Sequence, residues 1–200
     1  MILRTYFNDR ADTWDENVAE KDTAKLERMA ERLGLKPDST VLDVGTGTGV
    51  FLPYILSNIG VNGMIVALDL AEEMLKKARM KRFNGSIGYL QADITDIPLG
   101  NSIFDCVVCY SSFPHFQDKV KALTEISRVM KKGGRVIICH TSSRAHINEI
   151  HRQLPDVRDD LIPDADEMRS MLLTAGFGDI KIEDDSDSYL ASALKPGKGD

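Results

Sequence analysis

The sequence predicts an α/β fold, a Rossmann-like three-layer sandwich in which helices cover both faces of a mostly parallel sheet. Three observations predict it. Short apolar runs alternate with helix-length segments along most of the chain. One of these runs ends in three alternating glycines at 45, 47 and 49, which indicates a strand, a tight nucleotide-binding turn and a helix. Two further runs near the end of the chain predict an antiparallel hairpin at one edge of the sheet.

Length and composition limit the alternatives. Two hundred residues with 42% apolar content fit a single domain over residues 1–200 that needs no disulfides. The three cysteines have no paired spacing, and no signal-peptide core or membrane-length apolar run occurs, so we expect a cytoplasmic protein that does not enter a membrane. A net charge of −6 argues against a nucleic-acid partner. The basic cluster at 76–82 fits a solvated helix end, and the oligomeric state stays open.

The elements expected from periodicity and turn residues are as follows. Helices are predicted at 9–20, 22–33, 71–81 and 165–175. Strands are predicted near 40–44, 64–68, 87–90, 104–109 and 134–139, and the hairpin at 178–183 and 188–193.

The glycine turn follows the strand that ends in Asp43-Val44. Glycine is needed there because the chain reverses sharply and a Cβ would keep a ligand away from the backbone. The spacing is G-x-G-x-G, and Val50 stands where the dinucleotide fingerprint has its third glycine. No Gly-Lys-Ser/Thr follows, so a phosphate loop is excluded. Taken alone, the turn fits nicotinamide, flavin or S-adenosylmethionine.

Acidic residues follow the next two predicted strands, at the edge of a parallel sheet where ligands bind. Asp69 is placed to accept hydrogen bonds from ribose hydroxyls, although it fits equally well as the N-cap of the helix at 71–81. Asp93 could accept from an adenine amino group while the next backbone N–H donates to the ring, or it could be an ordinary loop residue.

Several motifs together carry a resemblance that none of them carries alone. They are Asp43–Gly49, Asp69, Ala92–Asp93 with Ile97–Leu99, Phe104–Cys109 and Ile126–Val136. In this combination the sequence resembles a class I S-adenosylmethionine-dependent methyltransferase of the small-molecule kind that includes the ubiquinone and menaquinone methyltransferases. The resemblance covers roughly residues 5 to 195. It extends to Tyr6-Phe7 and Trp14-Asp15, which are similar to the segment that folds over the cofactor in this family.

The resemblance implies S-adenosylmethionine as the cofactor, a seven-stranded sheet with an antiparallel last strand, and a small-molecule acceptor. It also implies that residues 1–33 form a helical cap. The glycines would cradle the methionine moiety, with Asp43 near its ammonium group, Asp69 on the ribose, and Asp93 with the Ile94 backbone on the adenine. The implied cofactor-binding residues are Asp43, Gly45, Thr46, Gly47, Gly49, Asp69, Leu70, Asp93 and Ile94.

Methyl transfer from a sulfonium is an in-line displacement, and alignment of the reactants alone can supply about 7–11 kcal/mol. A base is needed only where the attacking group loses a proton. The loop at 110–116 follows the fourth strand, where the acceptor approaches in this family. The candidate catalytic residues are therefore Tyr110, His115 and His140.

An apparent insertion at 141–162 lies at the rim of the expected acceptor pocket. It holds His146 and His151, so all four histidines are predicted on the active face. A metal or a metallo-tetrapyrrole held by these histidines is an alternative function. On a regular helix, however, His146 and His151 would lie about 140° apart and could not bind one ion together. We therefore assign no metal ligand. A second alternative is an NAD-dependent oxidoreductase, which the glycine spacing disfavours.

Overall fold

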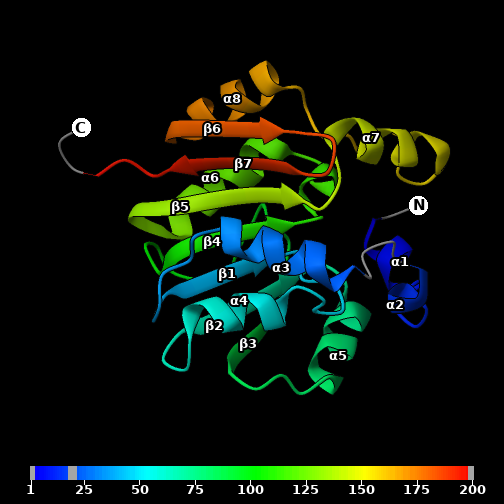
Figure 1. The fold of residues 1–200 in the computed structure, drawn as a ribbon, viewed down its shortest axis with the longest axis horizontal. Helices are drawn as coiled ribbons and strands as arrows, with labels where there is room; N and C mark the ends of the chain where they lie inside the picture. Colours follow the sequence, from blue (N-terminus) through cyan, green and yellow to red (C-terminus); the bar gives the residue numbers. More distant parts are fainter. Residues whose placement is uncertain (1–2, 18–21, 198–200) are drawn as a thin grey trace.

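A computed structural model gives the protein's structure and describes residues 3–17 and 22–197. The strands form a seven-stranded sheet in the order β3-β2-β1-β4-β5-β7-β6, as Figure 1 shows. The strands are β1 (Thr40–Val44), β2 (Met64–Asp69), β3 (Ser86–Gln91), β4 (Phe104–Tyr110), β5 (Met130–His140), β6 (Gly178–Asp184) and β7 (Tyr189–Leu194). The helices are α1 (Leu3–Asn8), α2 (Trp14–Asn17), α3 (Thr23–Arg32), α4 (Leu52–Ile59), α5 (Glu72–Met80), α6 (Lys119–Val129), α7 (Arg144–Gln153) and α8 (Ala165–Thr174), with a short 3₁₀ turn η1 (Phe113–His115).

The topology confirms the predicted fold class. Strands β1 to β5 pair in parallel. β7 lies between β5 and β6 and runs antiparallel to both. The expected hairpin is therefore present at the edge of the sheet.

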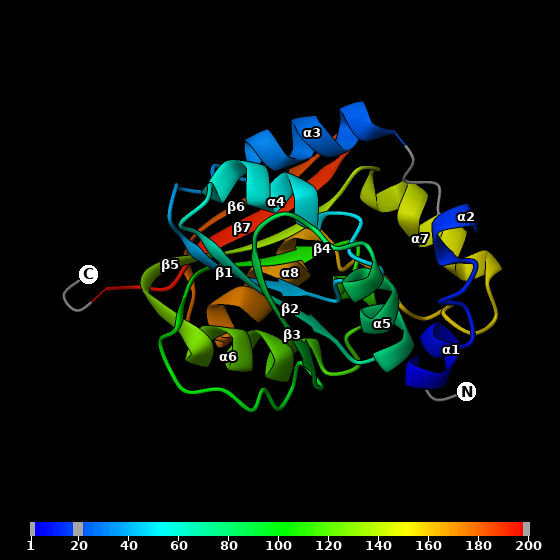
Figure 2. The same ribbon diagram turned by 90° about the horizontal axis from the view of Figure 1, so that it is seen from below.

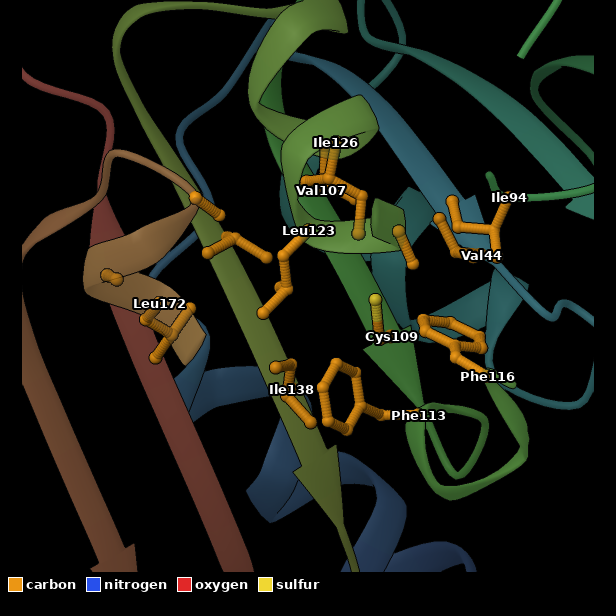
Figure 3. Close-up of a cluster of buried hydrophobic side chains, with 14 of the residues drawn as sticks. Val44, Ile94, Val107, Cys109, Phe113, Phe116, Leu123, Ile126, Ile138 and Leu172 are labelled. Atoms are coloured by element: carbon orange, nitrogen blue, oxygen red, sulfur yellow. The ribbon is translucent and has the colours of Figure 1, made fainter. Parts of the chain in front are cut away.

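Helices cover both faces of the sheet (Figure 2). α3 and α4 pack over one face, where Leu26, Leu52 and Ile55 join the buried residues of the strands. α6 and α8 cover the other face. Figure 3 shows Leu123 of α6 and Leu172 of α8 among the buried side chains of this second core. The two cores hold the central strands rigidly, and they fix the positions of the strand ends.

The first predicted helix, at 9–20, is wrong in its boundaries. The structure has two short helices, α1 and α2, separated by turns at residues 9–13, and residues 18–20 lie outside the described part of the chain. Polar Asp9, Asp12 and Thr13 favour turns over a helix interior, because their side chains compete for backbone hydrogen bonds. The helix at 22–33 is confirmed as α3, but it packs on the sheet. Of the helical cap expected at 1–33, α1 and α2 lie beyond the strand ends and α3 does not (Figures 1 and 2).

The segment formed by α1 and α2 (residues 3–17), called the cap segment below, attaches to α5 through ion pairs and through apolar contacts of Phe7 and Trp14 with Met74. Arg4 pairs with Glu72 at 2.7 Å between Nη2 and Oε1. The basic cluster of α5 also takes part, since Lys77 and Lys81 pair with Asp12 and Asp15 of the cap segment. The cluster is therefore more than a solvated helix end.

The cap segment and α7 lie together at the end of the molecule toward which the arrows of β5 and β6 point (Figures 1 and 2). These are the carboxyl ends of the parallel strands, where ligands bind in open α/β sheets. Among residues 3–17 and 22–197, no helix reaches the length and apolarity that crossing a membrane requires.

Candidate functional site

A cavity of about 700 Å³ opens at these strand ends. One side, which we call the glycine-loop half, is lined by residues of the turn at 45–48, of 68–70 and of 92–95. The opposite side, the histidine half, is lined by Phe7, Tyr110, His115, His140, Ile147, Ile150 and His151. The two halves form one continuous cavity, so a ligand on the glycine loop would face the imidazole rings.

The glycine loop is fixed by the strand beside it. The backbone N–H groups of Gly45 and Thr46 donate to the carbonyl of Leu68 at 2.8 and 3.0 Å. Gly45 has φ of +69°, and a Cβ built there would lie 2.4 Å from Cβ of Ser112. Only glycine fits this position, because both the backbone angle and the neighbouring loop exclude a side chain.

Asp69 ties the loop to the start of α5. Its Oδ2 accepts from the Gly47 N–H at 2.7 Å and its Oδ1 from the Ala71 N–H at 2.8 Å. Ala71 is the N-cap of α5, so Asp69 is not the cap residue that the alternative interpretation required. Burial raises the pKa of Asp69 to about 6, and these backbone hydrogen bonds oppose the rise. Each carboxylate oxygen keeps a lone pair that could accept from a hydroxyl on the cavity side.

Asp43 lies beneath the loop in β1, only 2% exposed, and is absent from the cavity wall. Burial raises its pKa to about 7, and the negative charge of Asp69 adds to that rise. Thr46 also lines the cavity, and its side chain interacts with the Asp43 carboxyl and opposes the rise of that pKa.

The remaining residues predicted to bind a nucleoside also reach the cavity. Asp93 and Ile94 line it together with Leu70. The Asp93 side chain hydrogen-bonds within its own loop, where its Oδ1 accepts from both the backbone N–H and the hydroxyl of Thr95 at 2.8 Å. Ile94 is buried and presents an apolar surface, which suits the face of a flat aromatic ring.

Tyr110 and His140 end the two central strands of the histidine half. The Tyr110 ring stacks on Phe51 at 4.2 Å between centroids, and its hydroxyl lies 3.2 Å from Oγ1 of Thr141. The next residue, Ser111, has φ of +50°, an unusual angle for a side-chain-bearing residue that turns the loop sharply toward the cavity.

His140 is 2% exposed and lines the cavity, yet neither ring nitrogen has a hydrogen-bond partner among the described residues. Burial, together with the nearby imidazoles of His115 and His151, lowers its pKa to about 3. At neutral pH this ring is therefore uncharged, with one donor and one acceptor nitrogen. A buried imidazole in this state can donate to or accept from a polar group that enters the cavity.

His115 and His151 form a close pair with ring centroids 5.0 Å apart. His115 Nδ1 lies 2.9 Å from Oδ2 of Asp160, and His151 Nδ1 hydrogen-bonds to the backbone carbonyl of the same aspartate. Burial lowers the pKa of His151. Phe7 of the cap segment packs edge-on against the His115 ring at 5.1 Å. Sequence reasoning missed Asp160, which lies inside the range 141–162 without any motif around it.

His146 does not join the other histidines. It is exposed on α7, whereas Ile147, Ile150, His151 and Leu154 at i, i+3, i+4 and i+7 form the helix face toward the cavity. The prediction that all four histidines share the active face is therefore wrong for His146. Across residues 3–17 and 22–197 there is no group of three His, Cys, Asp or Glu side chains that could hold a metal ion. Cys109 and Cys139 are buried, as expected of free cysteines.

Known proteins resemble this chain in sequence. A family model described as a methyltransferase domain matches residues 42–138. The ubiquinone/menaquinone biosynthesis C-methyltransferase of Proteus mirabilis is 30% identical over 150 residues, which are 70% of this chain and 60% of that protein. The enzyme of the same name from Escherichia coli K12 is 32% identical over 147 residues, or 68% and 59% of the two chains. The chain thus spans about 60% of the length of these relatives.

Solved structures agree with the fold. A structure described as a SAM-dependent methyltransferase from Aquifex aeolicus has a TM-score of 0.73 at 25% sequence identity. The match covers 94% of this chain and 98% of the other.

Proposed function

Since this chain belongs to the class I S-adenosylmethionine-dependent methyltransferases, we propose that it methylates a small, uncharged aromatic acceptor that carries a hydroxyl group. The single observation that carries the proposal is the continuous cavity. It connects the glycine loop with the imidazoles of His115, His140 and His151, of which His115 is paired with the carboxylate of Asp160. The metal and nicotinamide alternatives have no comparable support.

The glycine-loop half fits the methyl donor of this family. The glycine turn lets an amino-acid moiety approach the backbone, and the cavity-side lone pairs of Asp69 offer hydrogen-bond positions for a ribose. Asp93 and Ile94 offer a carboxylate and an apolar surface for an adenine. Asp43 would act through its negative charge beneath the loop, without touching the ligand. When bound, S-adenosylmethionine supplies a methyl group activated by the positive charge of its sulfur.

The histidine half favours an uncharged acceptor. Its walls are aromatic and aliphatic, with Phe7, Ile147 and Ile150 around the imidazoles. The one guanidinium nearby, that of Arg10, is occupied by Asp156 at 3.2 Å and lies over the Tyr6 ring at 3.7 Å. A charged acceptor would lose its hydration against these apolar walls.

The imidazoles supply the two functions that a hydroxylated ring needs. His140 binds the hydroxyl oxygen or its hydrogen while staying uncharged. His115 accepts the proton that the acceptor loses as its nucleophilic atom takes the methyl group, and the Asp160 carboxylate stabilises the resulting imidazolium. Cap residues Phe7 and Trp14 line the cavity and limit the access of water.

The relatives add support for the class of acceptor. The names of these relatives describe C-methylation in ubiquinone and menaquinone biosynthesis. A hydroquinone ring combines a flat apolar body with weakly acidic hydroxyls, which are the features that the histidine half would bind. We therefore propose a ring carbon of a hydroquinone-type molecule as the atom methylated.

The test uses S-adenosylmethionine labelled in its methyl group and three acceptor classes: a reduced naphthoquinone, a simple phenol and a primary amine. We expect label in the reduced naphthoquinone, and little in the amine. His115→Ala should lower the rate by about a hundredfold while leaving S-adenosylhomocysteine binding intact. His146→Ala, on the solvent side of α7, is the matched control. Label in the amine alone, or binding without transfer to any class, would refute the proposal.

A further inference from the structure

We infer that Asp160 is a positioning residue that holds the protons of two imidazoles, His115 and His151, on their Nδ1 atoms and leaves both Nε2 atoms free to act as bases toward the cavity. The role of these bases in methyl transfer rests on the proposed function. The fixed positions of the two protons depend only on the contacts of Asp160.

The contacts come from two different groups of Asp160. The carboxylate oxygen Oδ2 lies 2.9 Å from Nδ1 of His115, and the backbone carbonyl oxygen faces Nδ1 of His151. A carboxylate and a carbonyl oxygen can only accept hydrogen bonds, so each Nδ1 must carry the proton. Each neutral ring then has an unprotonated Nε2 atom. Among the described residues, neither Nε2 atom has a protein hydrogen-bond partner.

Asp160 acts from behind the cavity wall. His115 and His151 line the cavity, but Asp160 does not. The side chains of His115 and Asp160 are only 15% and 14% exposed, so water screens their interaction weakly. Asp160 would therefore not touch an acceptor, and its effect would pass through the two rings.

The segment that carries Asp160 is held in place. Asn148 of α7 is buried and bonds reciprocally to Ile162, with its Nδ2 donating to the carbonyl at 3.0 Å and its Oδ1 accepting from the N–H at 2.8 Å. Val157 is buried on the other side of Asp160. These contacts fix the backbone on both sides of Asp160, so its carbonyl and its carboxylate keep their directions.

The arrangement also decides which imidazole takes a proton. Only His115 has a carboxylate partner among the three rings, whereas burial lowers the pKa of both His140 and His151. The two rings of the close pair disfavour simultaneous charging. A proton released in the cavity therefore goes to Nε2 of His115, and the other two rings stay neutral hydrogen-bonding groups.

The test measures the imidazole ¹⁵N chemical shifts of the full chain without any acceptor, at a pH where the rings are neutral. In the wild type, His115 and His151 should both show a protonated Nδ1 and an unprotonated Nε2. In Asp160→Ala, His115 should lose this tautomer while His151 keeps it, because the backbone carbonyl remains. Asp159→Ala, an exposed neighbouring carboxylate, should change neither ring.

Two results would overturn the inference: an Nε2-protonated His115 in the wild type, or an unchanged His115 in Asp160→Ala. The wild-type spectrum alone decides if the alanine variant fails to fold. Asp160→Asn should preserve the tautomer through its amide oxygen, yet lower kcat by about tenfold or more with little change in KM, because the charge is lost. If the tautomers are as stated but no acceptor is methylated, the proposed function fails and the positioning role stands.

Discussion

The two halves of the cavity are built in opposite ways. The glycine-loop half comes from three neighbouring strand ends, and its key carboxylate, Asp69, already accepts two backbone hydrogen bonds within the protein. The histidine half is assembled from the cap segment, the loop after β4, the end of β5 and α7. It leaves the buried His140 ring without a protein partner. The central carboxylate of the first half is thus hydrogen-bonded within the protein, whereas the buried imidazole of the second half is not.

This difference separates binding of the donor from choice of the acceptor. Changes in the glycine-loop half should act on cofactor affinity and on folding. Changes in the histidine half should act on methyl transfer and on pH dependence, with little effect on cofactor affinity.

The largest effect is expected from Gly45→Ala. The new Cβ would meet Ser112 at 2.4 Å and adopt a positive φ, so the loop must move. We expect a loss of about 2–4 kcal/mol in the free energy of unfolding and no measurable binding of S-adenosylhomocysteine by calorimetry.

Gly176→Ala is the control for Gly45→Ala, since Gly176 also has a positive φ of +84° but nothing within 4 Å of the built Cβ. It should cost about 1–2 kcal/mol and leave cofactor binding unchanged. Equal losses of binding in the two variants would contradict the account of the loop.

Asp69→Asn should come next in size. Hydrogen bonds from ribose hydroxyls to a carboxylate are stronger than to an amide, so the Kd for S-adenosylhomocysteine should rise about 10–100-fold at pH 8. In the wild type, protonation below the raised pKa of about 6 should weaken binding by up to about tenfold per pH unit, as titration calorimetry would show.

The asparagine variant should lack that part of the pH dependence. Asp43, whose pKa is raised to about 7, titrates in the wild type and in the variant alike. The difference between their pH profiles therefore reports the contribution of Asp69 alone. Parallel pH profiles for the two proteins would exclude Asp69 from cofactor binding. Asp96→Asn, an exposed residue absent from the cavity wall, should behave as the wild type.

His140→Phe tests the histidine half through the pH dependence of the free energy of unfolding. Burial lowers the folded-state pKa of His140 to about 3, so between that value and about 6.5 the unfolded chain binds a proton that the folded chain does not. The wild type should therefore lose about 1.4 kcal/mol per pH unit through this group as the pH falls below 6.5. Denaturant unfolding at several pH values should show a shallower acid decline for His140→Phe. An identical decline would mean that His140 is protonated in the folded state.

The smallest effect is expected from the ion pairs of the cap segment. Lys81→Met removes the partner of Asp15 at 2.7 Å, but both side chains are partly exposed. We expect a change of about fivefold or less in the Kd for S-adenosylhomocysteine, vanishing at 0.5 M salt. A large effect that persists at high salt would mean that Lys81 acts through more than a screened surface ion pair.

The same contrast explains what sequence could predict. The strand positions, the terminal hairpin and the glycine loop follow from local patterns, because each depends on residues adjacent in the chain. The loop, Asp69 and Asp93 were predictable for that reason. Asp69 also has a structural role, holding Gly47 and Ala71, which spacing alone did not indicate.

The histidine half depends on contacts distant in sequence. Asp160 contacts His115 although the two residues are 45 positions apart in the sequence, and no local motif indicates such a pair. His146 was misplaced because its orientation depends on where α7 begins. Ile147, Ile150, His151 and Leu154 show the helical spacing that would have separated His151 from His146. The predicted helix at 9–20 did not allow for the turns at 9–13, which the polar side chains of Asp9, Asp12 and Thr13 favour.

A crystal structure of the protein with S-adenosylhomocysteine tests the central claim most directly. We predict the ribose hydroxyls on Asp69, the adenine beside Asp93 and Ile94, and the sulfur facing the cavity side that holds His115 and His140. A ligand bound outside the cavity, or with its sulfur turned away from the imidazoles, would contradict the division of the cavity into a donor side and an acceptor side.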